Sequence, residues 1–345
     1  MHGDDRSSNG SPEAARELHR LLNGFQITQA IHVAAVLGVA DHVGQDSARP
    51  VAEIAADVGA HPDALYRLLR ALAAIGLFRE QSDRLFSLTP MGACLRTDSP
   101  HPMRPHATFV GQQNQWNAWG HLLHSVRTGE NAFRAVHGMS SWEYRARHPE
   151  QNDIFNAAMT GNSRRIEEAV VASCDLGRCD RIADIGGGQG SLLAAMLQAN
   201  TRLRGVLFDR PHVVAGAGPV LAAAGVQDRC ETIGGDMFES VPAGCDAYVM
   251  KYIIHDWDDA HCRRILHACR SAMTADARLI VIDRLLGPPN EDPAVKLADL
   301  HMLVGPGGQE RTLEEFTALF RAEGLRIAEV RPTRSPVSLL VLERA

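Results

Sequence analysis

A histidine in the C-terminal half of the chain and two acidic residues after it have the chemistry of an oriented proton acceptor. The unperturbed pKa of histidine, about 6.5, suits His255 to proton removal near neutrality. Asp283 ends a predicted strand and Glu310 follows a Gly-Pro-Gly-Gly segment, so we expect both acids on the same side of a sheet. A carboxylate bonded to one imidazole nitrogen fixes the tautomer and stabilises the imidazolium that forms when the other nitrogen takes a proton. The other role open to His255 is that of a helix cap beside Asp256.

The second stretch with evident chemistry is a glycine-rich loop. In it Asp184, Gly186, Gly188 and Gly190 alternate with other residues, after a short apolar strand and before an Ala/Leu-rich helical pattern. Glycines lack the β-carbon and let a nucleotide-like ligand lie against the backbone, at which the next helix aims free N–H groups. The spacing differs from the G-x-G-x-x-G of dinucleotide folds, and the Asp184 carboxylate would repel a pyrophosphate. The alternative is a glycine-rich surface turn.

Two further acids follow predicted strands of the same sheet. Ligands of such sheets bind at the carboxyl ends of the strands. Asp209 lies about 20 residues beyond the glycine loop, where a carboxylate can bind both hydroxyls of a ribose. Asp236 and Met237 offer an acid and an apolar side chain for the amino edge and the face of an adenine. Each acid alone is a common loop residue, but together with the loop they predict a nucleoside site.

A strand–helix alternation positions these residues. Strands are predicted at 181–185, 204–208, 229–233, 246–250 and 278–282, and helices at about 191–199, 212–224, 259–273 and 312–323. This pattern predicts an α/β fold with a doubly wound parallel sheet. The last two predicted strands, 325–331 and 337–342, are parted only by a short Pro/Ser turn and form a closing antiparallel hairpin, unlike a dinucleotide-binding fold. We place this domain at 175–345.

The N-terminal part is predicted to be helical and to contain a winged helix. After a polar tip at 1–11, which we expect to be disordered, residues 12–38 form helices with a broad apolar face that needs a large partner such as a second subunit. Helices at 51–55 and 62–75 precede a hairpin of strands 77–79 and 84–88, whose turn is Gln81-Ser82-Asp83. The winged-helix domain spans 12–100.

A DNA-binding regulator is the first alternative raised by a winged helix. Its second helix would have to present basic residues to a groove, yet it offers only Arg67 and Arg70 among leucines. The formal net charge of −6 also gives no electrostatic reason to expect nucleic acid. We therefore expect a winged helix reused as a dimerisation module.

A helical connector at 101–174 joins the two parts and is rich in aromatic residues. Stacking on a flat substrate and simple packing explain these residues equally well. The seven cysteines are scattered and odd in number, which fits a reducing cytoplasm, and we expect no zinc site at Cys262 and Cys269. No signal peptide or membrane-spanning stretch is expected.

The ordered motifs of the chain resemble one family. They are Asp184–Gly188, Phe208–Val213, Gly235–Phe238, His255–Trp257 and Gly307–Thr312. In this order they resemble class I S-adenosylmethionine-dependent O-methyltransferases of small molecules, of the caffeic-acid and hydroxyindole type and of its bacterial natural-product branch. The resemblance covers nearly the whole chain, because the family also carries an N-terminal winged-helix dimerisation domain.

The resemblance implies roles for individual residues. His255 would be the base, flanked by Asp283 and Glu310, and Phe155 and Met159 would line the acceptor pocket. The residues implied at S-adenosylmethionine are Asp184, Gly186, Gly188, Asp209, Asp236, Met237, Lys251 and Trp257. Plant members usually have Glu where Asp283 stands, so its shorter side chain could orient His255 less firmly.

The sequence thus predicts a cytoplasmic homodimer that methylates a hydroxyl, of phenolic type, on a small aromatic natural product. Oxygen would displace the methyl group in line from S-adenosylmethionine, leaving S-adenosylhomocysteine, with no metal, nucleic acid or membrane involved. Two alternatives remain open: other chemistry with the same cofactor, such as hydroxylation or decarboxylation, and a cofactor-binding regulator. The identity of the acceptor does not follow from the sequence.

Overall fold

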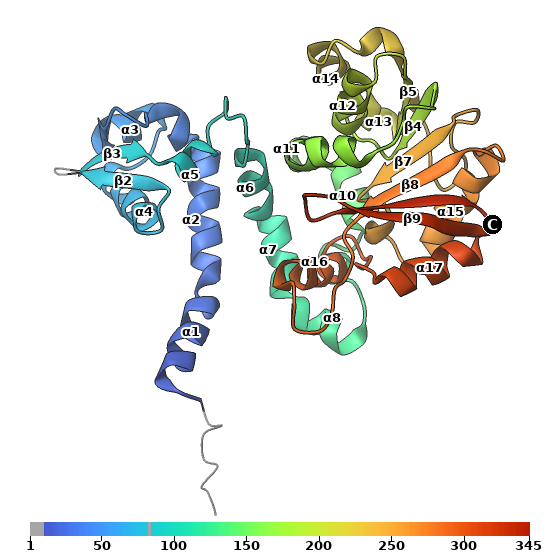
Figure 1. The fold of residues 1–345 in the computed structure, drawn as a ribbon. Coiled ribbons are helices and arrows are strands. Elements are labelled where there is room, and N and C mark those ends of the chain that lie inside the picture. The colour runs from blue at the N-terminus through green and yellow to red at the C-terminus, as the bar shows by residue number, and fades with distance from the viewer. Residues whose placement is uncertain (1–9, 82–83) are drawn as a thin grey trace, which may run out of the picture. The chain divides into compact units, whose positions relative to one another are not determined.

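The chain divides into two compact units, Met1–Gln112 and Gln113–Ala345 (Figure 1). The structure, a computed structural model, describes residues 10–81 and 84–345. Most of the predicted N-terminal tip, and Ser82 and Asp83 of the predicted hairpin turn, therefore lie outside the described residues. Ser11, which was expected in the tip, is the N-cap of the first helix, and its side chain accepts a hydrogen bond from the Ala14 N–H (3.1 Å).

The first unit follows the predicted order of elements. Its elements are α1 (Pro12–Leu22), α2 (Gly24–Leu37), η1 (Val39–His42), β1 (Arg49–Pro50), α3 (Val51–Asp57), α4 (Pro62–Ala74), β2 (Phe78–Gln81), β3 (Leu85–Leu88), α5 (Pro90–Ala93) and α6 (Arg104–Val110). The strands form an antiparallel sheet in the order β1-β3-β2, to which the unpredicted, two-residue β1 adds an edge. Helix α4 directs Leu65, Leu69 and Leu72 into the core of this unit, as an inward-facing helix should.

Helices α1 and α2 expose a broad apolar surface. No described residue of α1 is buried, and Leu18, Leu21 and Leu22 are 59%, 60% and 66% exposed. Phe25 and Val36 of α2 are each 54% exposed. Apolar surface of this extent is unusual on a monomer and marks an interaction face.

The second unit begins with helices and continues as a seven-stranded sheet. The helices are α7 (Gln113–Gly120), α8 (Leu122–Thr128), α9 (Ala132–His137), α10 (Ser141–Arg147) and α11 (Pro149–Ser173). The strands are β4 (Arg181–Ile185), β5 (Arg204–Asp209), β6 (Cys230–Gly234), β7 (Ala247–Lys251), β8 (Arg278–Asp283), β9 (Leu325–Pro332) and β10 (Ser338–Arg344). Their order is β6-β5-β4-β7-β8-β10-β9, with parallel pairs from β6 to β8 and antiparallel pairs at β10 and β9. The predicted parallel sheet and closing hairpin are confirmed.

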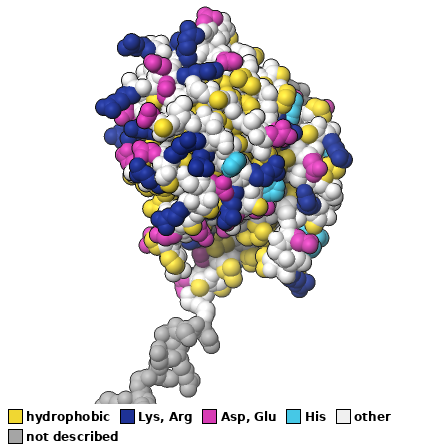
Figure 2. Space-filling view, turned by 90° about the vertical axis from the view of Figure 1, so that its right-hand side faces the viewer, with side chains coloured by type: hydrophobic (Ala, Val, Ile, Leu, Met, Phe, Trp, Pro, Cys, Tyr) yellow, Lys and Arg dark blue, Asp and Glu magenta, His cyan; other side chains and the backbone are white. Residues whose placement is uncertain are grey.

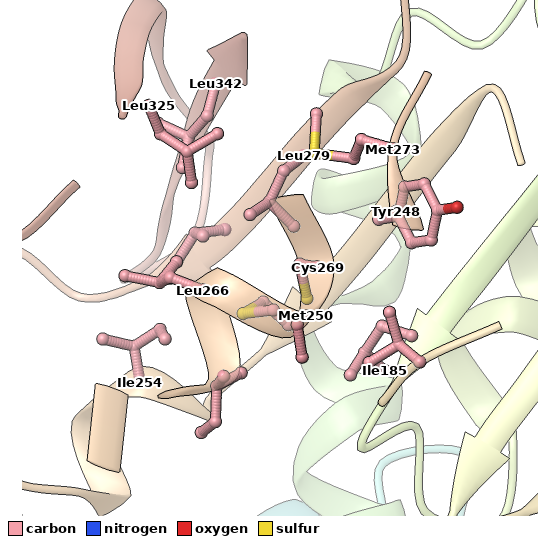
Figure 3. Packing of buried hydrophobic residues seen from close by; sticks show 14 of the residues in the cluster. Ile185, Tyr248, Met250, Ile254, Leu266, Cys269, Met273, Leu279, Leu325 and Leu342 are labelled. Atoms are coloured by element: carbon pink, nitrogen blue, oxygen red, sulfur yellow. The ribbon is translucent and has the colours of Figure 1, made fainter. Parts of the chain in front are cut away.

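Successive residues of the central strands point to opposite faces, and each face has its own core. Ile182 and Val249 pack with α11 and with the helices α12 (Ser191–Ala199) and α14 (Gly218–Ala223) on one face. Ala183, Tyr248 and Met250 pack with α15 (Asp259–Ala272) and α17 (Leu313–Ala322) on the other. Figure 3 shows the second cluster, in which leucines of α15 and β8 lie beside Met250. Burial on both faces is typical of a parallel sheet and explains the nearly continuous apolar runs of its strands.

The crossover helices differ from the prediction in two places. They are α12 (Ser191–Ala199), α13 (Pro211–Val214), α14 (Gly218–Ala223), α15 (Asp259–Ala272), α16 (Pro293–Val304) and α17 (Leu313–Ala322), with the short turns η3 (Gln227–Arg229) and η4 (Ile254–Asp256). The single helix predicted at 212–224 is wrong, since it is broken between α13 and α14. Glycine at 216 and 218 and a proline at 219 disfavour a continuous helix there. Helix α16 was not predicted.

The remaining features are the charge pattern of one face and the character of the helices. On the face drawn in Figure 2, cationic and anionic side chains are interspersed among apolar and uncharged ones. Among the residues that the structure describes, no helix has both the length and the apolar character required to cross a membrane.

Candidate active site

The glycine loop after β4 has the backbone shape that its sequence indicates. Gly186, Gly188 and Gly190 have φ of 69°, 62° and 82°, a region that residues with a β-carbon rarely adopt. A Cβ atom on Gly186 would also overlap the Ile253 side chain, whereas one on Gly188 would meet no atom within 4 Å. The loop therefore needs glycine for its conformation, and it leaves open space beside Gly188.

Two of the predicted acids lie at this loop. Asp209, at the end of β5, accepts a hydrogen bond from the Gly188 N–H (2.8 Å), and burial raises its pKa. Asp184, in β4, is only 2% exposed, and its Oδ2 has no hydrogen-bond partner among the described residues. Burial raises the pKa of Asp184, while the positive charge of Lys251 opposes that rise. An unpartnered buried carboxylate oxygen calls for a specific explanation, and a ligand bound at this edge of the sheet is one.

Lys251 lies within the same group of charges. It ends β7, and its ammonium group donates a hydrogen bond to Ser163 of α11. Burial lowers the pKa of Lys251 below its ordinary value, and the negative charges of Asp184 and Glu167 only partly offset this effect. Glu167 accepts a hydrogen bond from Ser191, the first residue of α12. No sequence signal indicated that α11 supplies Ser163 and Glu167 to this edge.

The loop after β6 brings the remaining predicted nucleoside residues. Asp236 accepts a hydrogen bond from the Phe238 N–H (2.9 Å) and forms an ion pair with Arg210 (2.6 Å). Met237 lies against the glycine loop, since its sulfur is 3.9 Å from the position that a Cβ on Gly186 would take. Asp236 and Asp209 are thus linked through Arg210, whose backbone N–H donates to Asp209 (2.6 Å).

His255 and the two predicted acids meet in the protein interior. His255, in η4, is 6% exposed, and its Nδ1 lies 3.2 Å from Asp283 Oδ1 and 3.2 Å from Glu310 Oε1. Its Nε2 lies 3.6 Å from Asp256 Oδ1. The helix-cap role considered for His255 is therefore wrong, because both acids bind its side chain.

These carboxylates set the proton affinity of the imidazole. Burial alone would lower the pKa of His255, but the negative charges of Asp283 and Asp256, and the hydrogen bonds that the imidazole donates to Asp283 and Glu310, raise it well above its ordinary value. Burial raises the pKa of Asp256 to about 6. An imidazole whose Nδ1 faces two carboxylates is a strong proton acceptor at Nε2.

Glycine at position 308 allows the Glu310 segment to reach His255. A Cβ on Gly308 would overlap the carbonyl oxygen of His255, and the Gln309 N–H donates to that carbonyl (2.9 Å). Arg311, 1% exposed, donates hydrogen bonds to the carbonyls of Ile254 and Trp257 (both 3.0 Å) and ties the two segments together. The sequence contained this glycine motif but did not reveal the anchoring role of Arg311.

Tyr252 supports His255 from the side. Their rings stack with centroids 5.1 Å apart and planes 11° apart. Tyr252 has a φ of 56°, which is costly for a residue with a large side chain and is found mostly where a site constrains the backbone. Sequence reasoning missed this contact, because a left-handed tyrosine has no recognisable sequence signal.

The same trio has the geometry to hold a metal ion. Each of the three residues, His255, Asp283 and Glu310, offers one ligand atom, and these three atoms all lie within 4.8 Å of one another. Asp283 Oδ2 and Glu310 Oε2 have no hydrogen-bond partner among the described residues. The trio therefore has the chemistry to bind either a proton or a cation. The cysteines considered for zinc do not gather: Cys262 donates to the Ile254 carbonyl, and Cys269 is buried in the core.

Aromatic side chains from the connector lie next to this centre. Trp142 of α10 stacks on Trp257 with centroids 5.5 Å apart and planes 19° apart. Phe155 of α11 meets Trp142 edge to face at 5.9 Å, and Met159 is half-buried one turn further along α11. Phe133 instead belongs to a separate packing cluster. Phe133 therefore has the packing role, whereas stacking of connector aromatics on a substrate stays a prediction.

Known protein families match both parts of the chain. The O-methyltransferase domain matches residues 119–326, and the O-methyltransferase dimerisation domain matches residues 19–98. The chain is 44% identical to phenazine O-methyltransferase PhzM of Lysobacter antibioticus, with 94% of each chain covered. It is 40% identical to the mitomycin biosynthesis 6-O-methyltransferase of Streptomyces lavendulae, with 96% of this chain and 95% of the relative covered.

Solved structures agree with these matches. The crystal structure of LaPhzM has a TM-score of 0.93 at 42% identity and covers 96% of this chain and 99% of its own. NcsB1, an O-methyltransferase from neocarzinostatin biosynthesis, was solved with S-adenosylmethionine and 2-hydroxy-5-methyl naphthoic acid; its TM-score is 0.79 at 32% identity, covering 92% of this chain and 96% of its own.

Proposed function

Because the chain belongs to the O-methyltransferase family, we propose that it methylates a phenolic hydroxyl of a small aromatic natural product, with His255 as general base. It is an S-adenosylmethionine-dependent O-methyltransferase of natural-product biosynthesis. The observation that carries the proposed mechanism is the buried imidazole whose Nδ1 lies 3.2 Å from two carboxylates.

The residues at the glycine loop fit the cofactor. The unpartnered Asp184 oxygen and the open space beside Gly188 lie where a nucleoside with a charged amino-acid tail could bind. We assign Asp209 to the ribose hydroxyls, and Asp236 and Met237 to the adenine. Gly186, Gly188 and Lys251 complete the assigned cofactor contacts, together with Trp257. When bound, S-adenosylmethionine supplies a methyl group on a positively charged sulfur.

His255 acts on the acceptor. Asp283 and Glu310 hold the proton on Nδ1, which leaves Nε2 to remove the proton from the acceptor hydroxyl. The same carboxylates stabilise the imidazolium that results, and the phenolate oxygen becomes the nucleophile. Holding the oxygen in line with the methyl group contributes further, since proximity and orientation can be worth about 7–11 kcal/mol.

The aromatic wall favours a flat acceptor. Trp142 contacts both Phe155 and Trp257, and all three residues lie in the same unit as His255. Such side chains bind ring systems by stacking and edge contacts. We assign Phe155 and Met159 to the acceptor pocket. The 2-hydroxy-5-methyl naphthoic acid in the NcsB1 complex is a small hydroxylated aromatic compound, the chemical type that we expect of the acceptor.

The dimerisation domain needs a partner for its exposed apolar surface. The exposed side chains of α1 and α2, among them Leu18, Leu22 and Phe25, overlap the matched dimerisation domain or lie beside it. We propose that a second copy of the chain covers them. Burying such side chains provides a driving force of about 25 cal/mol per Å² of apolar surface.

The reaction is tested by incubating the protein with methyl-labelled S-adenosylmethionine and phenolic, indolic and catechol acceptors, with and without EDTA. We expect label on an aryl oxygen at a rate that EDTA does not change. Loss of activity with EDTA, restored by a divalent cation, would reassign the His255 trio to metal binding. Tight cofactor binding without transfer to any acceptor would favour other chemistry with the same cofactor, or a regulator.

A further inference from the structure

Helix α10 carries two buried donors that the mechanism does not use. The indole Nε1 of Trp142 and the guanidinium Nη1 of Arg145 are both inaccessible to solvent, and neither has a hydrogen-bond partner among the described residues. They lie three residues apart and therefore on one face of the helix. Buried donors without acceptors are rare in folded proteins and call for a specific explanation.

The guanidinium of Arg145 is held by the aromatic wall. Its central carbon lies 3.7 Å from the ring centroid of Phe155 and 4.8 Å from that of Trp142. Contacts with these ring faces orient the cation without using its N–H groups. Arg145 is thus fixed beside the residues assigned to the acceptor, with donor capacity left over.

Arg145 also lies within the electrostatic reach of the catalytic centre. Its charge interacts with that of Asp256, the residue after His255, but no described carboxylate forms an ion pair with Arg145. Burial lowers the pKa of Arg145 to about 10, so the group remains charged at neutral pH. Arg145 is half-buried as a residue, but its Nη1 is shielded from solvent, and an N–H of a cation that has no acceptor there is poorly compensated by the protein alone.

We propose that Arg145, together with Trp142, binds a carboxylate on the aromatic acceptor, so that the preferred acceptors are aromatic hydroxy acids. A guanidinium presents its donors in a planar fork that matches a carboxylate, and the indole N–H adds a further donor on the same helix face. The inference rests on the proposed function and extends it to a substrate class. Arg145 would determine specificity, whereas His255 performs the chemistry.

The main competing role for Arg145 is that of a structural counter-charge to Asp256. A counter-charge would affect all acceptors equally, because Asp256 is next to the base. A carboxylate-binding residue affects acids only and acts mainly on KM. Acceptors matched in shape but differing in charge therefore separate the two roles.

The experiment compares hydroxynaphthoic acids with their primary amides, using the full-length protein and the variants R145M, R145K and R147M. Arg147 is an exposed residue of the same helix and provides the control. For the unchanged protein we expect a lower KM for the acid than for its amide. Loss of a charge-assisted contact, about 1.5–3 kcal/mol, predicts that R145M reduces this preference roughly 10- to 150-fold. We expect partial rescue in R145K and the full preference in R147M.

Two controls keep the result interpretable. Melting temperature and S-adenosylhomocysteine affinity report on folding, and R145K replaces R145M if the latter does not fold. An equal effect of R145M on acids and amides, or no preference for acids in the unchanged protein, would overturn the proposal while leaving methyl transfer intact. If no acceptor is methylated, the proposed function fails. The role of Arg145 is then decided by calorimetry, which compares binding of the acid and of its amide to the unchanged protein and to R145M.

Discussion

The cofactor edge and the acceptor side of the second unit are built in different ways. At the cofactor edge, Asp209 and Lys251 are the last residues of β5 and β7, and Gly188 lies in the loop directly after β4. At the acceptor side, His255 meets carboxylates from two other segments, and the connector helices α10 and α11 bring Trp142 and Phe155 to the aromatic wall. The first region is a feature of the fold, whereas the second depends on contacts between distant parts of the chain. Binding the cofactor and selecting the acceptor should therefore be separable by mutation.

The substitution with the largest expected effect lies at Gly308. In Gly308→Ala the added Cβ overlaps the His255 carbonyl oxygen, so the Glu310 segment must move away from the imidazole. We expect turnover to fall on the order of 10²–10⁴-fold, as for loss of the base, with nearly unchanged affinity for S-adenosylhomocysteine. Gly287→Ala is the matched control, because a Cβ there meets no atom within 4 Å. A parallel loss of cofactor affinity would show that the two regions are not separable.

A substitution at Gly186 should have the opposite pattern of effects, with weaker cofactor binding and little change in turnover. In Gly186→Ala a residue with a β-carbon must adopt a φ of 69° and overlap Ile253. The conformational cost of about 1–2 kcal/mol predicts cofactor binding that is roughly 5- to 30-fold weaker. Calorimetry with S-adenosylhomocysteine measures this directly. At saturating cofactor we expect little change in kcat, and a kcat loss as large as that of Gly308→Ala would contradict the division.

The smallest expected effect is a shift in pH dependence. The base must be neutral to accept a proton, so activity falls as the pH drops through the pKa of His255, which lies above its ordinary value. Asp283→Asn removes a carboxylate that raises this pKa, so the acidic limb of the kcat/KM profile should move to lower pH. An unmoved limb would mean that another group limits activity. The Asp283→Glu variant, which keeps the charge, serves as the comparison.

The sequence predicted the cofactor edge better than the acceptor side, because the cofactor edge depends on signals that are local in the chain. The parallel sheet was predictable because apolar periodicity and strand-end acids such as Asp209 are local signals. The break between α13 and α14 was missed although Gly216 and Pro219 lie there. Helix α16 was missed as well.

The acceptor side was less predictable. Phe155 and Met159 belonged to the connector residues that were open to stacking or packing, and only the family resemblance assigned them to the acceptor pocket. Arg145 was indistinguishable in sequence from the exposed charges around it, and the left-handed backbone of Tyr252 has no sequence signal. These features depend on packing between α10, α11 and the segment around His255. Periodicity reports which face of an element is buried, but not against which distant residue it packs.

The most direct test of the central claim is single-turnover methyl transfer by His255→Ala, measured beside its affinity for S-adenosylmethionine. We expect near-normal affinity and a transfer rate that is lower on the order of 10²–10⁴-fold near neutral pH. The deficit should shrink at a pH high enough to ionise the phenol in solution, because the acceptor then needs no base. An unchanged rate near neutrality would contradict the assignment of His255 as the base.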